Sequence, residues 1–201
     1  MLTSPKISVV TPTHNRHNWL VSCIEQTINQ DVTIPYEHIV VSDGQDNQVL
    51  KICKHYNIKC QCIDKEISTG TSKGHLARDT GISMANGKYL LLWDDDNIYY
   101  KHAMSTFMQE IEEYDILVCR INYRVRRISF PDLYDQIPKK WNNTFERSDI
   151  DTMNVMIKTK LARKFKWTDC NDYSGDFHWL KKLEEYGAKI KYCDKIVGIK
   201  N

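Results

Sequence analysis

The chain has 201 residues, of which 41% are hydrophobic and 27% are charged, and its formal net charge is +2. This length allows a single domain with a sizeable core, and the composition is typical of a globular protein. The low net charge gives no reason to expect a nucleic-acid binder. No signal peptide is visible, and no apolar run approaches the roughly 18 residues of a membrane span. We therefore expect either a soluble protein or one domain of a larger, multidomain protein whose anchor lies elsewhere.

Seven cysteines, an odd number, are scattered through the expected helices and strands. This pattern favours a reducing compartment over a disulfide framework, so we expect a cytoplasmic location. Cys53, His55, Cys60 and Cys62 lie close enough in sequence to suggest zinc, but their spacing fits no common zinc finger. Buried free thiols are the better interpretation of these cysteines.

The first half, residues 1–97, alternates between strand and helix patterns. Short apolar or β-branched runs predict strands over 6–11, 36–42, 58–63 and 88–93. Helical spacing predicts the intervening helices, which end near residue 28, run over 46–56 and run over 72–85. This β-α-β-α-β-α-β order is typical of a parallel sheet between layers of helices, with right-handed crossovers.

Local signals predict where these helices begin, end and face the core. Asn15 or Asn18 is expected to cap the first helix, and Asn86-Gly87 is expected to close the third with a left-handed C-cap. The apolar spacing of the first helix includes Trp19 and Ile28, and that of the second places Leu50 inward.

The second half, residues 98–201, is more irregular. We expect helices over 102–114, 160–165 and 175–186, and strands over 115–122, 123–128, 148–158 and 188–192. Residues 130–147 are irregular and carry Tyr134, Trp141 and Phe145, while 166–174 form a polar loop. No linker or repeat divides the chain, so 1–201 is predicted to be one α/β domain with a mostly parallel central sheet.

The stretch KYLLLWDDDN, residues 88–97, carries the strongest chemical signal. A strand buried on both faces stops at three consecutive carboxylates, Asp94, Asp95 and Asp96. Such neighbours repel one another unless a positive group lies among them. Carboxylates at the end of a buried strand suit Mg²⁺ or Mn²⁺ together with a phosphorylated substrate. The alternative is a solvated acidic loop.

Two common phosphate-binding motifs are absent. No Gly-Lys-Ser/Thr follows a glycine at Walker spacing, and no G-x-G-x-x-G follows the first strand. A cation at the aspartates would therefore hold the phosphates, as a nucleotide-sugar enzyme needs, because its leaving group is a nucleoside diphosphate.

Five motifs in this order resemble the GT-A glycosyltransferases of family two. They are ISVVTPTHNR (7–16), VVSDG (40–44), a helix with Gly74, Ala77, Arg78 and Gly81, ANGKY (85–89) and WDDDN (93–97). The resemblance is close over the first half and weaker towards the end, and it extends to small virus-encoded members. It implies a GT-A, Rossmann-like fold with a nucleotide-sugar-binding half (1–97) and an acceptor-binding half (98–201).

The resemblance also implies roles for individual residues. Asp43 would accept the N3–H of uracil, Asp94 would lie near the ribose and metal, and Asp96 would bind the metal directly. Asp176 would be the catalytic base, with His178 as a tentative third metal ligand. The remaining residues of the nucleotide-sugar site would be Thr11, Pro12, Thr13, Asn15, Arg16, Gly74, Arg78 and Asp95.

Four positions depart from the family pattern. Gly175 stands where a Glu usually precedes the base, and Asn97, Trp93 and Asp79 replace a frequent acid, Leu and Asn.

Each assigned role has a structural alternative. Asp43 before Gly44 suits a turn, and Arg78 suits an exposed helix surface. Asp176 suits the N-terminal end of a helix dipole, and His178 suits the helix surface. Arg120, Arg124, Arg126 and Arg127 are interpreted as a solvated strand face or an acceptor-side charge set, rather than a nucleic-acid site.

We therefore expect an inverting glycosyltransferase that uses Mn²⁺ or Mg²⁺, a UDP-sugar donor and a glycan or glycoconjugate acceptor. Asp176 would deprotonate the acceptor hydroxyl, and 130–147 would form a lid over the acceptor. A retaining mechanism stays open. The rival functions are a sugar-nucleotide nucleotidyltransferase, which would release pyrophosphate, and a non-catalytic nucleotide- or carbohydrate-binding module.

Overall fold

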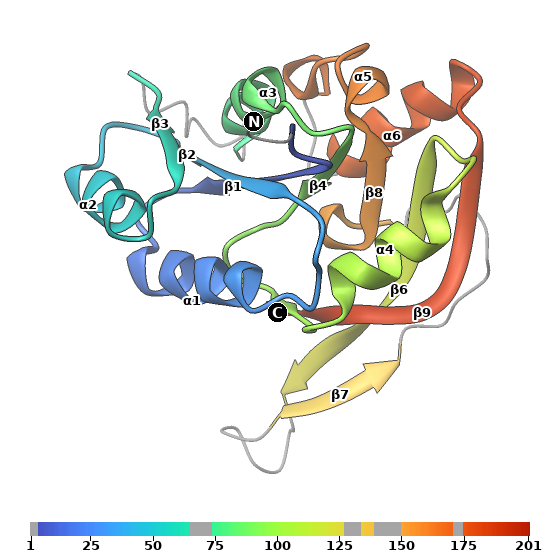
Figure 1. Ribbon diagram of the computed structural model, residues 1–201, viewed down its shortest axis with the longest axis horizontal. Helices are drawn as coiled ribbons and strands as arrows, with labels where there is room; N and C mark the ends of the chain where they lie inside the picture. The colour runs from blue at the N-terminus through green and yellow to red at the C-terminus, as the bar shows by residue number, and fades with distance from the viewer. Residues whose placement is uncertain (1–3, 65–73, 127–133, 139–149, 171–174) are drawn as a thin grey trace.

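The computed structural model describes residues 4–64, 74–126, 134–138, 150–170 and 175–201. Within them the strands form one nine-stranded sheet with the order β3-β2-β1-β4-β8-β6-β9-β5, and β7 pairs with β6. Helices flank this sheet, and the β6–β7 hairpin extends away from the rest of the molecule (Figure 1). The sheet continues from the first half of the chain into the second.

The first half has the predicted order of elements. These are β1 (Ile7–Thr13), α1 (His17–Ile28), β2 (Tyr36–Ser42), α2 (Asn47–His55), β3 (Lys59–Cys62), α3 (His75–Met84) and β4 (Tyr89–Leu92). All pairs among these four strands are parallel. The carboxyl ends of β1, β2 and β4 therefore meet at one edge of the sheet, where open α/β sheets bind ligands.

The second half completes the sheet with mixed pairing. Its elements are β5 (Ile98–Tyr99), α4 (Ala103–Ile111), β6 (Ile116–Arg126), β7 (Tyr134–Pro138), the 3₁₀ turn η1 (Thr152–Asn154), β8 (Val155–Lys158), α5 (Thr159–Ala162), the 3₁₀ turn η2 (Trp167–Asp169), α6 (Gly175–Glu185) and β9 (Ile190–Lys200). β8 runs antiparallel to β4 and β6, whereas β6 and β9 are parallel. The fold is α/β with a mostly parallel sheet, as predicted.

The strand predictions for the second half need correction. The separate strands expected over 115–122 and 123–128 are one strand, β6, whose pairing with β9 shifts register after Cys119. β9 reaches Lys200 instead of stopping near 192, and the two-residue strand β5 was not expected. In the described part of 148–158, η1 precedes β8. The bounds of these strands depend on pairing between residues far apart in the sequence, which the local sequence pattern does not predict.

Alternate residues of the central strands face two helical layers. Val10, Leu90 and Leu92 pack in a cluster with α3 and α6. Val9 and Leu91, on the other face of the sheet, pack in a cluster with α1 and α4. Each large apolar side chain buried here contributes about 1.5–3 kcal/mol. No helix in the described part is long and apolar enough to cross a membrane.

The predicted helix caps and two helix faces are wrong. The N-cap of α1 is Arg16, without a side-chain cap, while Asn15 adopts a left-handed φ of 52° just before it. Trp19, Ile28 and Leu50 are 45%, 49% and 41% exposed, because they lie at the edges of the apolar faces of α1 and α2.

The end of α3 is not a left-handed cap either. Ala85 is extended there, and the Gly87 N–H donates to Ser8 Oγ at 2.8 Å. Gly87 is needed for space, because a Cβ atom would lie 2.6 Å from the carbonyl carbon of Ile7 and from the backbone nitrogen of Ser8.

Replacing Gly87 with alanine is expected to destabilise the protein by about 1–3 kcal/mol, because backbone atoms cannot move aside as a side chain can. The midpoint of urea denaturation measures this effect. Ser83→Ala, at an exposed position of α3, is the matched control and should leave the free energy of unfolding within about 0.5 kcal/mol of wild type. Equal midpoints for the two variants would contradict the close approach at Gly87.

Candidate active site

The aspartate turn after β4 is anchored by two buried aromatic rings. Trp93 stacks on Tyr99 with ring centroids 4.0 Å apart, and the Tyr99 hydroxyl donates to the Asp94 carbonyl oxygen at 2.9 Å. Asn97 is buried, and its Oδ1 accepts the N–H of Asn201 at 3.2 Å. These contacts fix the turn between β4 and the end of β9.

Asp95 is the buried member of the three aspartates. Its Oδ2 accepts a hydrogen bond from Thr13 at 2.7 Å, and its Oδ1 lies 2.8 Å from Nη2 of Arg16. Burial raises the pKa of Asp95 to about 6, against the opposing effects of Thr13 and Arg16. Asp95 therefore holds the turn against β1 and lies outside the lining of the two pockets described below.

Asp94 is held by α3 and η1. Its Oδ1 lies 2.5 Å from Nη2 of Arg78, and its Oδ2 accepts a hydrogen bond from Thr152 at 3.0 Å. Arg78 is only 8% exposed, and its guanidinium lies 5.0 Å from the centroid of the Trp167 ring. Arg78 is thus a buried site cation, and the alternative of an exposed helix charge is wrong.

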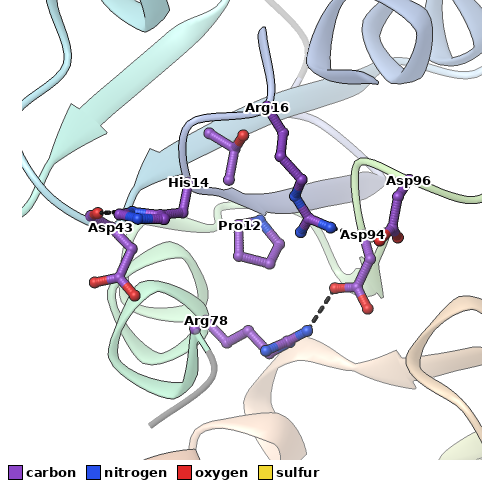
Figure 2. Close-up of a pocket in the computed structure, with 9 residues that line it drawn as sticks. Pro12, His14, Arg16, Asp43, Arg78, Asp94 and Asp96 are labelled. Atoms are coloured by element: carbon purple, nitrogen blue, oxygen red, sulfur yellow. Dashed lines mark hydrogen bonds and ion pairs between the residues drawn. The ribbon is translucent and has the colours of Figure 1, made fainter. Parts of the chain in front are cut away.

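A pocket of about 400 Å³ lies at the carboxyl ends of β1, β2 and β4. It is lined by Pro12, Thr13, His14, Arg16, Asp43, Gly74, Arg78, Asp94 and Asp96. Figure 2 shows Asp43 and His14 on one side, Asp94 and Asp96 on the opposite side, and Pro12 between them. We call this the donor pocket. Eight of its nine lining residues are predicted nucleotide-sugar or metal residues, and His14 is the ninth.

Asp43 has an unsatisfied oxygen in this pocket. The residue is 6% exposed, and its Oδ1 has no hydrogen-bond partner among the described residues. Its backbone carbonyl accepts a hydrogen bond from Nδ1 of His14 at 2.7 Å. A buried carboxylate oxygen without a partner is costly, so an N–H donor from a ligand would be favoured here.

A second pocket of about 360 Å³ adjoins the first. Arg16, Arg78, Asp94 and Asp96 line both. The second pocket is completed by His75, Asp151, Thr152, Trp167, Gly175, Asp176 and Lys200. We call it the base pocket, since it contains the predicted base Asp176.

Asp176 lies in the first turn of α6 and is partly buried. Its Oδ1 accepts the N–H of Phe177 at 2.8 Å. Burial and, after it, the negative charge of Asp151 raise the pKa of Asp176, while the Phe177 N–H, Lys200 and Arg78 oppose this rise. A carboxylate with a raised pKa is a stronger base, which suits proton removal from a hydroxyl.

Besides Asp95, three predicted site residues lie outside both pockets. Thr11 is buried beneath the donor pocket, where its hydroxyl lies 2.9 Å from Nε2 of His38. Asn15 lines a smaller cavity of about 230 Å³ that also contains Asp43. His178 is exposed on α6, and no metal group includes it among the described residues.

Sequence reasoning missed several lining residues. They are His14, His75, Asp151, Thr152, Trp167 and Lys200. Asp151 had a local signal in the sequence, because Asp is a preferred N-cap residue. In the structure its Oδ1 accepts the N–H of Met153 and caps η1. Lys200 had none, because only the full length of β9 brings it to the site.

Three further departures from the family pattern have local structural explanations. Gly175 packs against His75, since a Cβ atom there would lie 2.6 Å from the ring Nε2. Asp79 accepts hydrogen bonds from the backbone N–H groups of Trp167 at 2.8 Å and Thr168 at 3.1 Å. Asp79 thus ties α3 to η2, while Trp93 supplies the stacking contact under the aspartate turn.

Asp94 and Asp96 are the two carboxylates of the aspartate turn that line the donor pocket. No group of three or more His, Cys, Asp or Glu side chains in the described chain is arranged for a metal. Mg²⁺ and Mn²⁺ nevertheless need only one or two carboxylates when substrate phosphates complete the site. Both oxygens of Asp94 are occupied by Arg78 and Thr152, whereas Asp96 is 38% exposed and pairs with Arg16 at 2.5 Å. The donor set therefore fits a metal bound mainly by Asp96.

The remaining sequence hypotheses concern the cysteines, the proposed lid and the arginine set. All seven cysteines are free, and the rejected zinc cluster is absent from the described residues. In the proposed lid, Trp141, Phe145 and the side chain of Tyr134 lie outside the described part. Of the arginine set, Arg124 donates to Oδ1 of Asn201 at 3.3 Å, and Arg127 is not described.

Comparisons with known sequences agree on one family. The model of glycosyl transferase family 2 matches residues 8–183. The glycosyltransferase GlyA of Streptococcus pneumoniae serotype 4 is 30% identical over 217 residues, which cover 97% of this chain and 30% of GlyA. GlyG of the same strain is 31% identical over 123 residues, which cover 60% of this chain and 40% of GlyG. The chain thus spans less than half the length of these two relatives.

Solved structures share the fold. S. aureus TarS in complex with UDP-GlcNAc has a TM-score of 0.70 at 18% identity, covering 97% of this chain and 58% of that one. The mannosyltransferase PcManGT from Pyrobaculum calidifontis, in complex with GDP-Man and Mn²⁺, has a TM-score of 0.69 at 15% identity, covering 99% and 57%. The expected GT-A fold is confirmed.

Proposed function

Because the chain belongs to glycosyl transferase family 2, we propose that it transfers a sugar from a UDP-sugar to an acceptor hydroxyl, with metal dependence and inversion. The observation that carries this proposal is the adjacency of two pockets. One contains Asp43 and the aspartate turn, and the other contains Asp176, while Arg16, Arg78, Asp94 and Asp96 line both. A donor and an acceptor that occupied these pockets would meet beside the shared residues.

Asp43 is proposed to select uracil. Its unsatisfied Oδ1 would accept the N3–H of the base, a donor that cytosine lacks. The aspartate turn lies on the opposite side of the pocket, so the nucleotide would span it with its diphosphate towards Asp94 and Asp96 (Figure 2). The TarS complex with UDP-GlcNAc supports the choice of a UDP-sugar.

Asp96 is proposed to hold Mn²⁺ or Mg²⁺, with Asp94 beside it. Such a metal would stabilise the charge that develops on the departing diphosphate. The presence of Mn²⁺ in the PcManGT complex supports this proposal. Arg16 and Arg78 add positive charge to the side of the pocket that carries these aspartates. Gly74 allows the Arg78 guanidinium to lie close to the backbone, since a Cβ atom at Gly74 would lie 3.2 Å from Nη1 of Arg78.

Asp176 is proposed to take the proton of the acceptor hydroxyl while the oxygen attacks the anomeric carbon. Attack from the base pocket, with departure of UDP into the donor pocket, corresponds to inversion. The acceptor would be a glycan or glycoconjugate. The lid over 130–147, the cytoplasmic location and membership of a larger protein stay predictions.

Product analysis tests the proposed function. The protein is incubated with UDP-sugars or GDP-sugars, with and without Mn²⁺, and the released nucleotide is identified. Release of UDP from UDP-sugars only when the metal is present, with no release of GDP from GDP-sugars, supports the proposal. In a parallel reaction with UTP and a sugar 1-phosphate, release of pyrophosphate would indicate a nucleotidyltransferase. The absence of turnover across the panel, with glycan acceptors present, would indicate a binding module. Either outcome would contradict the proposal.

Replacing Asp43 with asparagine tests the base contact separately. The amide keeps the size of the side chain but removes its charge, so UDP affinity should fall about 10-fold to 100-fold. Isothermal calorimetry with UDP measures this loss. Asp64→Asn, at an exposed aspartate whose Oδ1 contacts Gln45 at 2.8 Å, is the control and should bind UDP as wild type does. Equal affinity in both variants would contradict the role of Asp43.

A further inference from the structure

Three charged groups from distant parts of the chain meet in the base pocket. Asp151 precedes η1, Asp176 lies in the first turn of α6, and Lys200 ends β9. All three line this pocket. The Lys200 ammonium makes an ion pair with Oδ2 of Asp151. The side chain of Asp151 is 5% exposed and that of Lys200 is 37% exposed, so the ion pair reaches from the interior into the pocket.

Asp151 is fully engaged by the protein. Besides Lys200, its carboxylate accepts the N–H of Met153 at 3.1 Å and is approached by the Thr152 hydroxyl at 3.4 Å. Because donors occupy both of its oxygens, Asp151 is poorly placed to accept a proton from a substrate. Asp151 is therefore held in place in the pocket that also contains Asp176.

We infer that the Asp151–Lys200 ion pair, which lines the same pocket as Asp176, is a positioning element that sets the electrostatic field at the Asp176 carboxylate. The negative charge of Asp151 strengthens Asp176 as a base, and the positive charge of Lys200 opposes this effect. The effect on catalysis rests on the proposed function, whereas the effect on proton affinity does not.

The other basic residues that line the base pocket contact partners other than Asp151. From α3, Arg78 is paired with Asp94, and His75 packs against Gly175 and lies 5.7 Å from the Trp167 ring centroid. Arg16, the N-cap of α1, pairs with Asp95 and Asp96 of the aspartate turn. Burial and Asp151 raise the pKa of Asp176, and Lys200 lowers it. The two members of the ion pair therefore act in opposite directions.

Carboxyl titration of the full chain by ¹³C NMR tests this inference without any substrate. The Asp176 signal is identified by its loss in Asp176→Asn. Asp151→Asn should lower the pKa of Asp176, and Lys200→Met should raise it. The double variant should return it towards the wild-type value. Asparagine is also a good N-cap, so Asp151→Asn is expected to fold.

Lys195→Met is the matched control, because Lys195 lies on the same strand but pairs with Glu110 at 2.7 Å. It should leave the pKa of Asp176 unchanged. An Asp176 pKa that is the same in wild type, Asp151→Asn and Lys200→Met would overturn the inference, as would shifts of the same sign in both variants. If Asp151→Asn does not fold, Lys200→Met and its control decide alone.

The pH profile of kcat/KM separates this inference from the proposed function. The acid limb should follow the measured pKa in each variant, moving to lower pH in Asp151→Asn and to higher pH in Lys200→Met. On that limb the rate changes about tenfold per pH unit. Titration shifts without a matching change in the limb would support the ion pair and contradict Asp176 as the base. An acid limb that is lost in Asp176→Asn but is unchanged in Asp151→Asn and Lys200→Met would support Asp176 as the base and contradict the role of the ion pair.

Discussion

Asp96→Ala is expected to abolish metal-dependent binding of UDP. Asp96 is the aspartate of the turn that is most open to the pocket, while both oxygens of Asp94 are occupied by Arg78 and Thr152. A metal that bridges a carboxylate and a diphosphate loses its protein anchor when this side chain is removed. Calorimetry with UDP should therefore give the same weak affinity for Asp96→Ala with and without Mn²⁺, and a large gain with Mn²⁺ for wild type.

The control for this prediction is Asp194→Ala, which removes the same charge from an exposed position on β9. It should retain the full response to Mn²⁺. Because Asp96 also pairs with Arg16, Asp96→Asn provides a second test that keeps the size of the side chain. A normal Mn²⁺ response in both Asp96 variants would remove Asp96 as the metal ligand.

Asp176→Asn is expected to keep donor affinity while losing transfer. The amide cannot take the acceptor proton, and general-base catalysis typically contributes about 10²-fold to 10⁴-fold. The side chain lines the base pocket and is not among the residues that line the donor pocket, so UDP binding should change little. Single-turnover transfer and UDP calorimetry on the same preparation measure the two effects.

Stability distinguishes a lost base from a damaged fold. Burial and the charge of Asp151 both disfavour ionised Asp176, so its folded-state pKa lies above the unfolded value. A carboxylate with a raised pKa destabilises the fold above that pKa, and this cost disappears as the pH falls below the unfolded value. Asp176→Asn should therefore be at least as stable as wild type at neutral pH. Near-normal turnover in this variant would exclude Asp176 as the base.

The fold of the first half was predictable because local pattern and tertiary environment agree there. Tyr89–Leu92 is apolar at every position, and all four residues are buried between two helical layers. The strand therefore needed no information from distant residues. The same agreement placed Asp43 and Asp96 at the carboxyl ends of strands, where they line one pocket.

The parts that sequence missed depend on long-range contacts. Asn15 provides a backbone turn before α1 instead of its cap, and Gly87 provides space against β1 instead of a left-handed φ. Lys200 reaches Asp151 only because β9 continues past the expected end near 192. Composition and periodicity describe neither close approaches nor the final register of a strand, so these residues had to be found in the structure.

A crystal structure with UDP and Mn²⁺, using the anomalous signal of manganese, tests the central claim most directly. The account predicts a manganese peak at Asp96 that contacts the diphosphate, with uracil at Oδ1 of Asp43. A nucleotide bound elsewhere, or bound in this pocket with no manganese at the aspartate turn, would contradict it.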